Sequence, residues 1–366
     1  KDYLTELAKE TPSVANIESY ADIIKQRSNL RRLISTAEDI SQTARESDSS
    51  ESDIVIDNAE ERILSLRDDM KRSQGPKVIK EILGPVYADI QEANESGTSL
   101  VGVSTGFDDI DDITLGFQNS DLIIVAGRPS IGKTSFAFNI AENVARQTNQ
   151  TVLLFSLEMS SEQVVRRFIS SIANIDLQRL LRGQLEEEDW EGIDKALSVL
   201  SSKNILLDDT PALTPPELRS RARRVKRESK DLAMIVVDYL QLMQVYGKSD
   251  NRVAEISEIS RSLKALAKEL NLPVVALSQL NRQVESRPDK RPHLSDLRDS
   301  GAIEQDADVV AFLYRHEHYE PDNLESQGIA EVNIAKQRNG PTGTIKLAFR
   351  KSVTRFENLA REDRFP

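Results

Sequence analysis

A phosphate-binding loop carries the clearest chemistry in this sequence. Residues 121–134 place an apolar stretch directly before the pattern GxxxxGK[ST], which ends at Thr134. Glycines in this pattern let consecutive backbone N–H groups converge on phosphate oxygens at a helix N-terminus, whose dipole favours negative charge. Lys133 is expected to reach the β- and γ-phosphates, and the Thr134 hydroxyl a Mg²⁺ ion. The pattern therefore predicts that the chain binds ATP or a close relative.

The nucleotide-contacting residues form one segment, and the surrounding sequence must supply a strand before it and a helix after it. The residues expected at the nucleotide are Gly127, Arg128, Pro129, Ser130, Ile131, Gly132, Lys133, Thr134 and Ser135. The alternative is a glycine-rich turn between a strand and a helix that holds no ligand.

From residue 100 onward, strand and helix patterns alternate, which predicts an α/β fold with a mostly parallel sheet. Strands are expected near 121–127, 151–157, 204–208, 233–238, 273–278, 308–313, 329–336 and 343–350. Helices are expected near 132–147, 160–173, 186–201, 214–229 and 252–270. Ligands of such sheets collect at the carboxyl ends of the strands, so the residues that follow each apolar stretch are the ones to inspect.

Three polar residues stand at such strand ends. Asp238 follows Met234-Ile-Val-Val and is suited to hold Mg²⁺ through water, as the Walker B aspartate does in P-loop NTPases. Glu158 ends Thr151-Val-Leu-Leu-Phe-Ser-Leu-Glu158 and is placed to take a proton from attacking water. Gln279 can hydrogen-bond a γ-phosphate and report its loss to the loop that follows. The alternative for Asp238 and Glu158 is an ordinary solvated strand end.

The segment from 280 to 302 has no clear periodicity, and loops of this length inside compact domains are functional or disordered. Its basic residues exceed its acidic residues by only one charge, so bulk electrostatics cannot make it a strong binder. Arg298, Gly301 and backbone amides could still hold a phosphodiester chain without reading bases. A mobile surface loop is the alternative.

Two further basic groups have open roles. Lys336 and Arg338 precede a Gly-Pro turn and could reach the γ-phosphate of a neighbouring subunit as an arginine finger does; an ordinary basic turn is the alternative. The helix expected at 214–229 carries basic residues around most of its surface, which favours a solvated face or subunit contact over nucleic-acid binding.

The N-terminal part is expected to be all helical. Apolar spacing predicts one helix over residues 17–46 and a second over about 53–67, which together form a helical hairpin. A short helix near 77–94 follows a linker, and Gly84-Pro85 is expected to interrupt or kink it. The predicted domains are thus a partial N-terminal helical domain at 1–70, a linker with a docking helix at 71–99, and an ATPase domain at 100–366.

Composition excludes several classes of protein. The 366 residues carry a net charge of −12, which argues against coating nucleic acid with the whole surface, so any such contact must be local. There are no cysteines and only three histidines, which excludes disulfides and cysteine zinc sites. No apolar stretch is long enough to cross a membrane, and a cytoplasmic protein without a membrane partner is expected.

Taken together, six ordered motifs resemble those of the bacterial replicative DNA helicases of the DnaB type. These are Gly127-Arg-Pro-Ser-Ile-Gly-Lys-Thr134, Phe155-Ser-Leu-Glu-Met159, Val237-Asp-Tyr-Leu-Gln-Leu-Met243, Leu277-Ser-Gln-Leu-Asn-Arg282, Leu297-Arg-Asp-Ser-Gly-Ala-Ile-Glu-Gln-Asp-Ala-Asp308 and Lys336-Gln-Arg-Asn-Gly-Pro341. The resemblance also covers Thr11-Pro-Ser-Val-Ala-Asn-Ile17 and the helical hairpin, which resemble the later part of the family's N-terminal domain. The globular head of that domain would precede Lys1.

The resemblance implies a homohexameric ring of RecA-like motor domains that moves 5′ to 3′ on single-stranded DNA in its channel. It implies that ATP and Mg²⁺ bind between subunits, with Lys133 and Thr134 on phosphate and metal, Asp238 supporting the metal, Glu158 activating water and Gln279 acting as sensor. Lys336 and Arg338 would be donated in trans, and Arg298, Asp299 and Gly301 would face DNA. The implied partners are primase, a helicase loader and the clamp-loader and polymerase assembly, at the replication fork in the nucleoid.

Two other interpretations share the same motifs. A RecA-like recombinase would form open filaments and pair DNA strands instead of closing into a ring. A nucleotide-gated scaffold would use ATP only to order an interface, and the set of Glu158, Asp238 and Gln279 favours true hydrolysis over it.

Overall fold

The computed structural model describes residues 17–48, isolated positions between 52 and 66, and residues 78–96, 101–202, 204–244 and 252–360. The chain divides into two units, residues 1–90 and residues 91–366. The predicted domain boundaries at 70 and 99 remain predictions. No helix within the described ranges has the length and apolar character needed to cross a membrane.

The helix predicted over 17–46 is confirmed as α2 (Ile17–Glu46). Most of the second predicted helix, at 53–67, lies outside the described residues, as do nearly all of Thr11–Ile17. The interruption predicted at Gly84-Pro85 is wrong, because α4 (Ile79–Ser96) continues through Pro85. Proline removes one N–H donor and frees the carbonyl of Glu81, but residues 81–88 are exposed, so water can bond this carbonyl.

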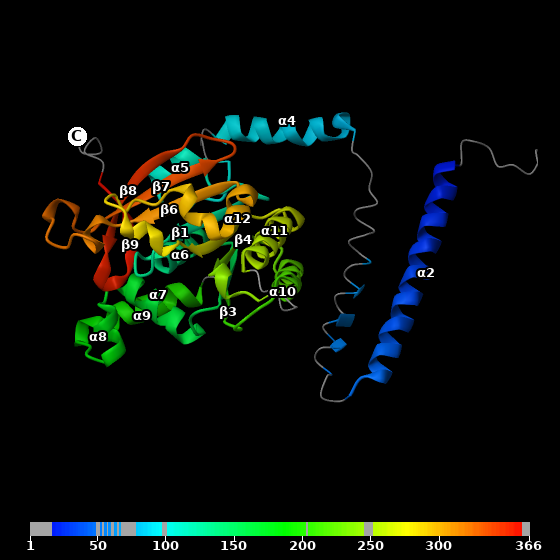
Figure 1. Cartoon of the computed structure of the whole chain (residues 1–366), viewed down its shortest axis with the longest axis horizontal. Helices are drawn as coiled ribbons and strands as arrows, with labels where there is room; N and C mark the ends of the chain where they lie inside the picture. The colour runs from blue at the N-terminus through cyan, green and yellow to red at the C-terminus, as the bar shows by residue number, and fades with distance from the viewer. Residues whose placement is uncertain are drawn as a thin grey trace, which may run out of the picture. The chain divides into compact units, whose positions relative to one another are not determined.

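Nine strands of the described residues form one sheet, in the order β3-β2-β4-β5-β1-β6-β7-β8-β9 (Figure 1). The strands up to β6 pair in parallel, and β7 to β9 pair antiparallel beyond it. Their bounds are β1 (Leu122–Gly127), β2 (Thr151–Ser156), β3 (Ile205–Asp208), β4 (Leu232–Asp238), β5 (Val274–Gln279), β6 (Val309–Tyr314), β7 (Ile329–Gln337), β8 (Gly343–Arg350) and β9 (Arg355–Asn358). The mostly parallel α/β fold predicted for residues 100–366 is therefore confirmed.

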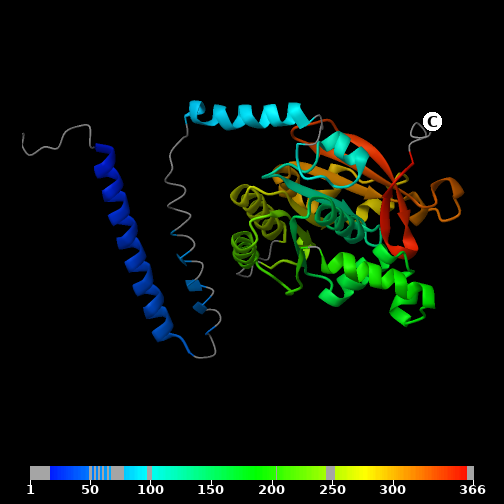
Figure 2. The ribbon, with the colours of Figure 1, turned by 180° about the vertical axis from the view of Figure 1, so that it is seen from behind.

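Helices cover both faces of this sheet, which explains why its central strands are apolar throughout. In β1, Ile123 and Val125 pack with the core that contains α6 (Lys133–Thr148) and α7 (Ser161–Ala173). Leu122, Ile124 and Ala126 of the same strand pack with α10 (Pro215–Glu228) and α11 (Arg252–Leu270) on the other face. Seen from behind, α9 (Glu187–Ser201) lies against α7 (Figure 2).

The strand register brings the predicted site residues to one edge. Gly127 of β1 lies opposite Gln279 of β5, and Ser156 of β2 lies opposite Asp238 of β4. Because the four strands are parallel neighbours in the order β2-β4-β5-β1, their carboxyl ends meet along a single line. The antiparallel β7 reverses this direction, and its last residue Gln337 lies opposite the first residue of β6.

The segment from 280 to 302 has more regular structure than its sequence predicts. It contains the 3₁₀ helices η4 (Arg282–Ser286) and η5 (Leu294–Ser300), and α12 (Gly301–Asp306) follows at once. Such short helices complete too few turns to give a readable hydrophobic period. The short helices α5 (Asp108–Thr114) and α8 (Leu177–Arg182) were missed for the same reason. Strand β9 has only 4 residues, which is too short to show a strand pattern.

Candidate active site

The loop between β1 and α6 has the backbone geometry of an anion site. Gly132 caps α6 with φ at +109°, and no side chain bonds to the free N–H groups of the first turn. A Cβ on Gly132 would lie 3.2 Å from the Phe356 ring, and one on Gly127 would lie 3.1 Å from the carbonyl oxygen of Leu313. Glycine is therefore required at Gly132, and the first amides of α6 remain available to phosphate oxygens.

Lys133 lies folded back over this loop. Its Nζ donates hydrogen bonds to the carbonyl oxygens of Gly127 at 2.9 Å and Arg128 at 3.0 Å. Burial lowers the pKa of Lys133 to about 8, while the charges of Asp238 and Glu158 act against the shift. A triphosphate in the loop would supply further negative charge and stabilise the ammonium form.

Thr134 and Asp238 fit the metal that the motif implies. Asp238 is 1% exposed, its carboxylate accepts a hydrogen bond from the Thr134 hydroxyl, and its Oδ2 atom has no hydrogen-bond partner. Burial raises the pKa of Asp238 to about 6. A buried carboxylate oxygen that lacks a partner suits a hard cation or a water bound to it.

The metal would draw its other ligands from phosphate and water. No group of three or more His, Cys, Asp or Glu side chains within the described ranges could hold an ion. A site that offers one hydroxyl and one carboxylate matches the way Mg²⁺ binds, with most of its ligands coming from the nucleotide and solvent.

Glu158 and Gln279 stand exposed at the same edge. The charge of Glu158 acts on the pKa values of both Lys133 and Asp238, which places the three groups close together. Gln241, in η3 (Leu240–Leu242), fixes the backbone at Gln279, because its Nε2 donates to the Ser278 hydroxyl at 2.9 Å and to the Gln279 carbonyl at 3.2 Å. Strand β5 is thus joined to the segment that follows Asp238.

The Arg128 side chain is committed elsewhere. Its guanidinium donates to Glu285 at 2.8 Å and to the carbonyl of Leu280 at 2.7 Å, and it is 5% exposed. Only the backbone of Arg128 remains to face a nucleotide, so this side chain instead joins the phosphate loop to η4.

Two arginines at the site were missed by sequence reasoning. Arg167 on α7 lies near Asp238 and Glu158, whose charges oppose the lowering of its pKa by burial. Arg315 is buried below the phosphate loop, where it donates to the carbonyl of Ile131 at 3.3 Å and forms an ion pair with Glu317. The position of Arg315 directly after β6 was a usable signal, whereas nothing in the sequence around Arg167 marks it.

The candidate DNA-binding segment is only partly described. The side chains of residues 298–300, including Arg298 and Asp299, lie outside the described residues, while Gly301 begins α12 with open space where a Cβ would stand. Arg287 pairs with Asp296 at 2.6 Å, and Arg291 pairs with Glu331 at 2.8 Å. These pairs reduce the charge that the segment can offer to phosphates.

Ion pairs within the chain occupy three arginines of the basic helix α10. Arg221 pairs with Asp208 at 2.7 Å, Arg219 pairs with Glu269 at 2.7 Å, and Arg223 also pairs with Glu269. The solvated face or subunit contact that the sequence favours for this helix stays a prediction.

The structure does not bring Lys336 and Arg338 to the phosphate loop. Both lie where β7 ends, which is the edge opposite the carboxyl end of β1. Lys336 donates to the carbonyl oxygens of Glu304 and Ala307, each at 2.6 Å. One subunit therefore carries the two groups of residues on opposite edges of its sheet.

Proteins of similar sequence and fold share one description. A family described as "DnaB-like helicase C terminal domain" matches residues 102–358. "Replicative DNA helicase DnaB" of Geobacillus stearothermophilus is 51% identical over 98% of this chain and 78% of that protein. "Replicative DNA helicase DnaC" of Bacillus subtilis is 49% identical over the same shares of both chains. The solved "Structure Of A DnaB-Like Replicative Helicase And Its Interactions With Primase" is 36% identical, with a TM-score of 0.82 over 98% of this chain and 83% of that one.

The raised pKa of Asp238 leads to a prediction about stability. Its folded pKa of about 6 exceeds the model-peptide value of 3.8, so ionised Asp238 destabilises the fold above about pH 6, and this cost vanishes below about pH 4. Asp238→Asn should raise the free energy of unfolding of the nucleotide-free protein by up to about 3 kcal/mol at pH 8 and by almost nothing at pH 4. Urea denaturation in EDTA measures both.

A matched control substitution, Asp208→Asn, should change the free energy of unfolding in the opposite direction. The hydrogen bonds and charge of Arg221 hold the pKa of the half-buried Asp208 below its usual value despite burial. Asp208→Asn should therefore destabilise the protein at pH 8, and this loss should shrink as the pH falls. Equal effects of the two substitutions at pH 8 would contradict the assignment of Asp238 as a carboxylate whose pKa is raised by burial.

Proposed function

Because this chain belongs to the family of DnaB-like replicative helicases and is an ATP-dependent DNA helicase, we propose that it hydrolyses ATP at sites shared between neighbouring subunits of a homohexameric ring. The observation that carries this proposal is the separation of its catalytic groups. The phosphate loop, Glu158, Asp238 and Gln279 share one sheet edge, while Lys336 and Arg338 occupy the other. A second copy is needed to complete the site.

The residues at the carboxyl edge perform the first half of the reaction. Glu158 takes a proton from water as the water oxygen attacks the γ-phosphorus, and the bond to the β–γ bridging oxygen breaks. Lys133 and the amides of α6 hold the phosphates in line, and Thr134 and Asp238 hold Mg²⁺. When bound, the ion neutralises charge on the β- and γ-phosphates. Gln279 contacts the γ-phosphate and Arg167 offers a further positive charge beside Glu158.

The groups from the neighbouring subunit complete the charge balance. Lys336 and Arg338 approach the γ-phosphate as negative charge develops on its oxygens, which is where an arginine finger has its largest effect. The RecA-like fold would also suit a filament, but a closed ring is the assembly that encloses one DNA strand and excludes the other.

The DNA strand passes along the segment 280–302. Arg298, Asp299 and Gly301 face the DNA, where the Arg298 side chain and backbone N–H groups contact the phosphodiester chain without reading bases, and the ring moves 5′ to 3′. The internal ion pairs of Arg287 and Arg291 support a modest, local contact. The net charge of −12 supports the same conclusion, because the rest of the surface repels DNA.

Primase is the first partner that we assign, since a structure 36% identical to this chain is described with its primase interactions. A helicase loader and the clamp-loader and polymerase assembly are the further partners, at the replication fork in the nucleoid. Mg²⁺ and ATP are the cofactors.

Removing the base and the phosphate-binding lysine should have different effects. Glu158→Gln should lower kcat for ATP hydrolysis by roughly 100-fold or more while nucleotide affinity stays near the wild-type value, because only proton transfer is lost. Lys133→Ala should lower both. Steady-state turnover and fluorescent-nucleotide titration measure these, and Glu162→Gln, on the exposed first turn of α7, is the matched control. A Lys133→Ala protein that still unwinds forks would refute the site.

The DNA-binding assignment rests on Arg298. Arg298→Ala should weaken binding of a single-stranded oligonucleotide about tenfold at 0.1 M salt and reduce the salt slope by about one, without changing nucleotide affinity. Fluorescence anisotropy across a salt series measures both. Arg291→Ala in the same segment is the control, because its guanidinium is already paired with Glu331. Equal losses for the two variants would remove Arg298 from the DNA site.

The shared site makes a prediction about mixed assemblies. Arg338→Ala should lower kcat by roughly 1,000-fold, as loss of an arginine finger does. Mixing these subunits with Glu158→Gln subunits should restore turnover, because a Glu158→Gln subunit can donate its intact Arg338 to the intact phosphate loop of its neighbour. Turnover of the mixture that stays at the sum of its two components would contradict donation in trans.

A further inference from the structure

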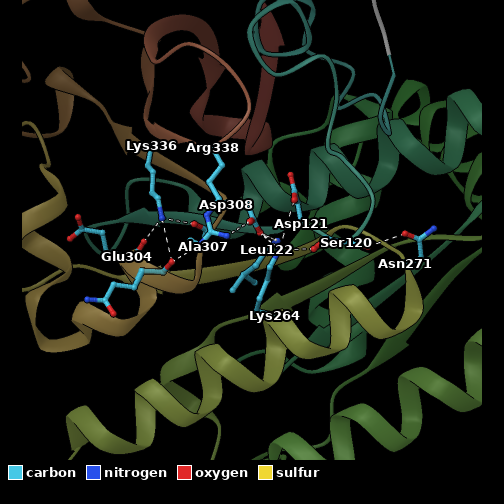
Figure 3. A network of polar contacts seen from close by, with 11 residues as sticks. Ser120, Asp121, Leu122, Lys264, Asn271, Glu304, Ala307, Asp308, Lys336 and Arg338 are labelled. Carbon is cyan, nitrogen blue, oxygen red and sulfur yellow. Dashed lines mark hydrogen bonds and ion pairs between the residues drawn. The ribbon is translucent and has the colours of Figure 1, made fainter. Parts of the chain in front are cut away.

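Asp308 lies at the start of β6, on the sheet edge that carries Lys336 and Arg338. Its side chain is 5% exposed. Oδ2 accepts the backbone N–H of Leu122 at 2.8 Å and also bonds the Nζ of Lys264, a contact drawn in Figure 3. The carboxylate is therefore fixed by a backbone amide of the central strand β1 and by a cation of α11.

Arg338 reaches this carboxylate from the end of β7. Its Nη1 lies 3.2 Å from Oδ1 of Asp308, and its Nη2 donates to the carbonyl oxygen of Gln305 at 2.8 Å. The backbone N–H of Arg338 also donates to the carbonyl of Asp308 at 3.0 Å. Both the main chain and the side chain of Arg338 are thus tied to residues 305–308.

These contacts orient Arg338 without engaging all of its hydrogen-bond donors. A guanidinium has five N–H donors in a rigid fork, and only two of its nitrogens are engaged here. The side chain is 48% exposed, so a second partner can reach it from solvent. A neighbouring phosphate could bind them while the bond to Asp308 stays in place.

Lys264 forms an ion pair with the buried Asp308 carboxylate. Its ammonium lies between the Asp308 carboxylate, the Ser120 carbonyl at 2.7 Å and the Asp121 carboxylate at 3.8 Å (Figure 3). Removing one partner of a buried ion pair is strongly destabilising, so Lys264 helps to hold this carboxylate in place. Lys264 itself does not contact Arg338, so any effect of Lys264 on the position of Arg338 acts through Asp308.

We propose that Asp308, held by Lys264, is a positioning residue that directs the Arg338 guanidinium toward the ATP of the neighbouring subunit. The proposal rests on the proposed function of Arg338 in trans. A long arginine side chain at a half-exposed edge would otherwise sample many rotamers, and fixing one end removes most of that freedom before the transition state forms. Asp308 would act through Arg338 and never touch substrate.

Asp308→Asn tests this role, with Asp121→Asn as the matched control. The asparagine keeps the size of the side chain and can still accept the Leu122 amide, but it loses the charge that attracts Arg338. The variant should lower kcat roughly 10- to 100-fold in the full oligomer, with KM for ATP and affinity for single-stranded DNA unchanged. Asp121→Asn makes the same change beside the same lysine and should leave kcat within about twofold of wild type.

Mixed assemblies separate positioning from a structural role. Mixing Asp308→Asn with Glu158→Gln subunits should restore turnover, because the defect lies in what a subunit donates, whereas a misfolded ATP site would not be rescued. If Asp308→Asn does not assemble, Lys264→Gln takes its place and should show a smaller loss with the same rescue. A wild-type kcat, or a loss without rescue, would overturn the proposal.

Arg338→Ala in the same mixing series distinguishes the two levels of inference. If Arg338→Ala is not rescued by Glu158→Gln, donation in trans fails and the role of Asp308 fails with it. If Arg338→Ala is rescued and Asp308→Asn is not, the shared site stands and only the positioning role is lost.

Discussion

The parallel register of β2, β4, β5 and β1 is the constraint on which the rest of the structure depends. It brings four chain segments that are far apart in sequence to one edge, with Gly127 opposite Gln279 and Ser156 opposite Asp238. The apolar strands below exclude water, and the same burial shifts the pKa values of Lys133 and Asp238 away from their charged forms. A nucleotide with its metal would relieve the electrostatic cost of these two shifts.

The antiparallel extension of the sheet places a second group of residues on the edge opposite the phosphate loop in each subunit. Strand β7 runs back beside β6, so the groups at its end lie on the edge opposite the phosphate loop. A subunit with complementary half-sites on two edges assembles head to tail, and such a contact produces a ring when its rotation closes. The location of Lys336 and Arg338 is therefore a property of topology as much as of the two side chains.

The sequence predicted what depends on local pattern and missed what depends on distant contacts. The phosphate loop and the eight predicted strands show a local pattern, because each is glycine-marked, continuously apolar or, as in β7 and β8, alternates buried and less buried residues. Arg167, Lys264 and Asp308 carry no such mark, since their partners lie on other elements. The interruption predicted at Pro85 was wrong because an exposed helix can hydrate the carbonyl that proline leaves free, whereas the kink given as its alternative stays a prediction. The order of residues 280–302 comes from ion pairs such as Arg287–Asp296, which no period reveals.

The two basic residues at the end of β7 differ in the hydrogen bonds that each must break to bind a phosphate. Lys336 has three N–H donors, and the carbonyls of residues 304, 305 and 307 accept from its Nζ at 2.6, 3.5 and 2.6 Å. Arg338 is bonded through only two of its nitrogens, to Asp308 and Gln305, and its side chain is 48% exposed. If Lys336 bound a phosphate instead, the carbonyl oxygens at the C-terminal end of α12 would lose their hydrogen-bond donor. This helix end would also lose the cation that stabilises the helix dipole. That helix begins at Gly301, so the cost of engaging a neighbour's nucleotide would fall on the segment proposed to hold DNA.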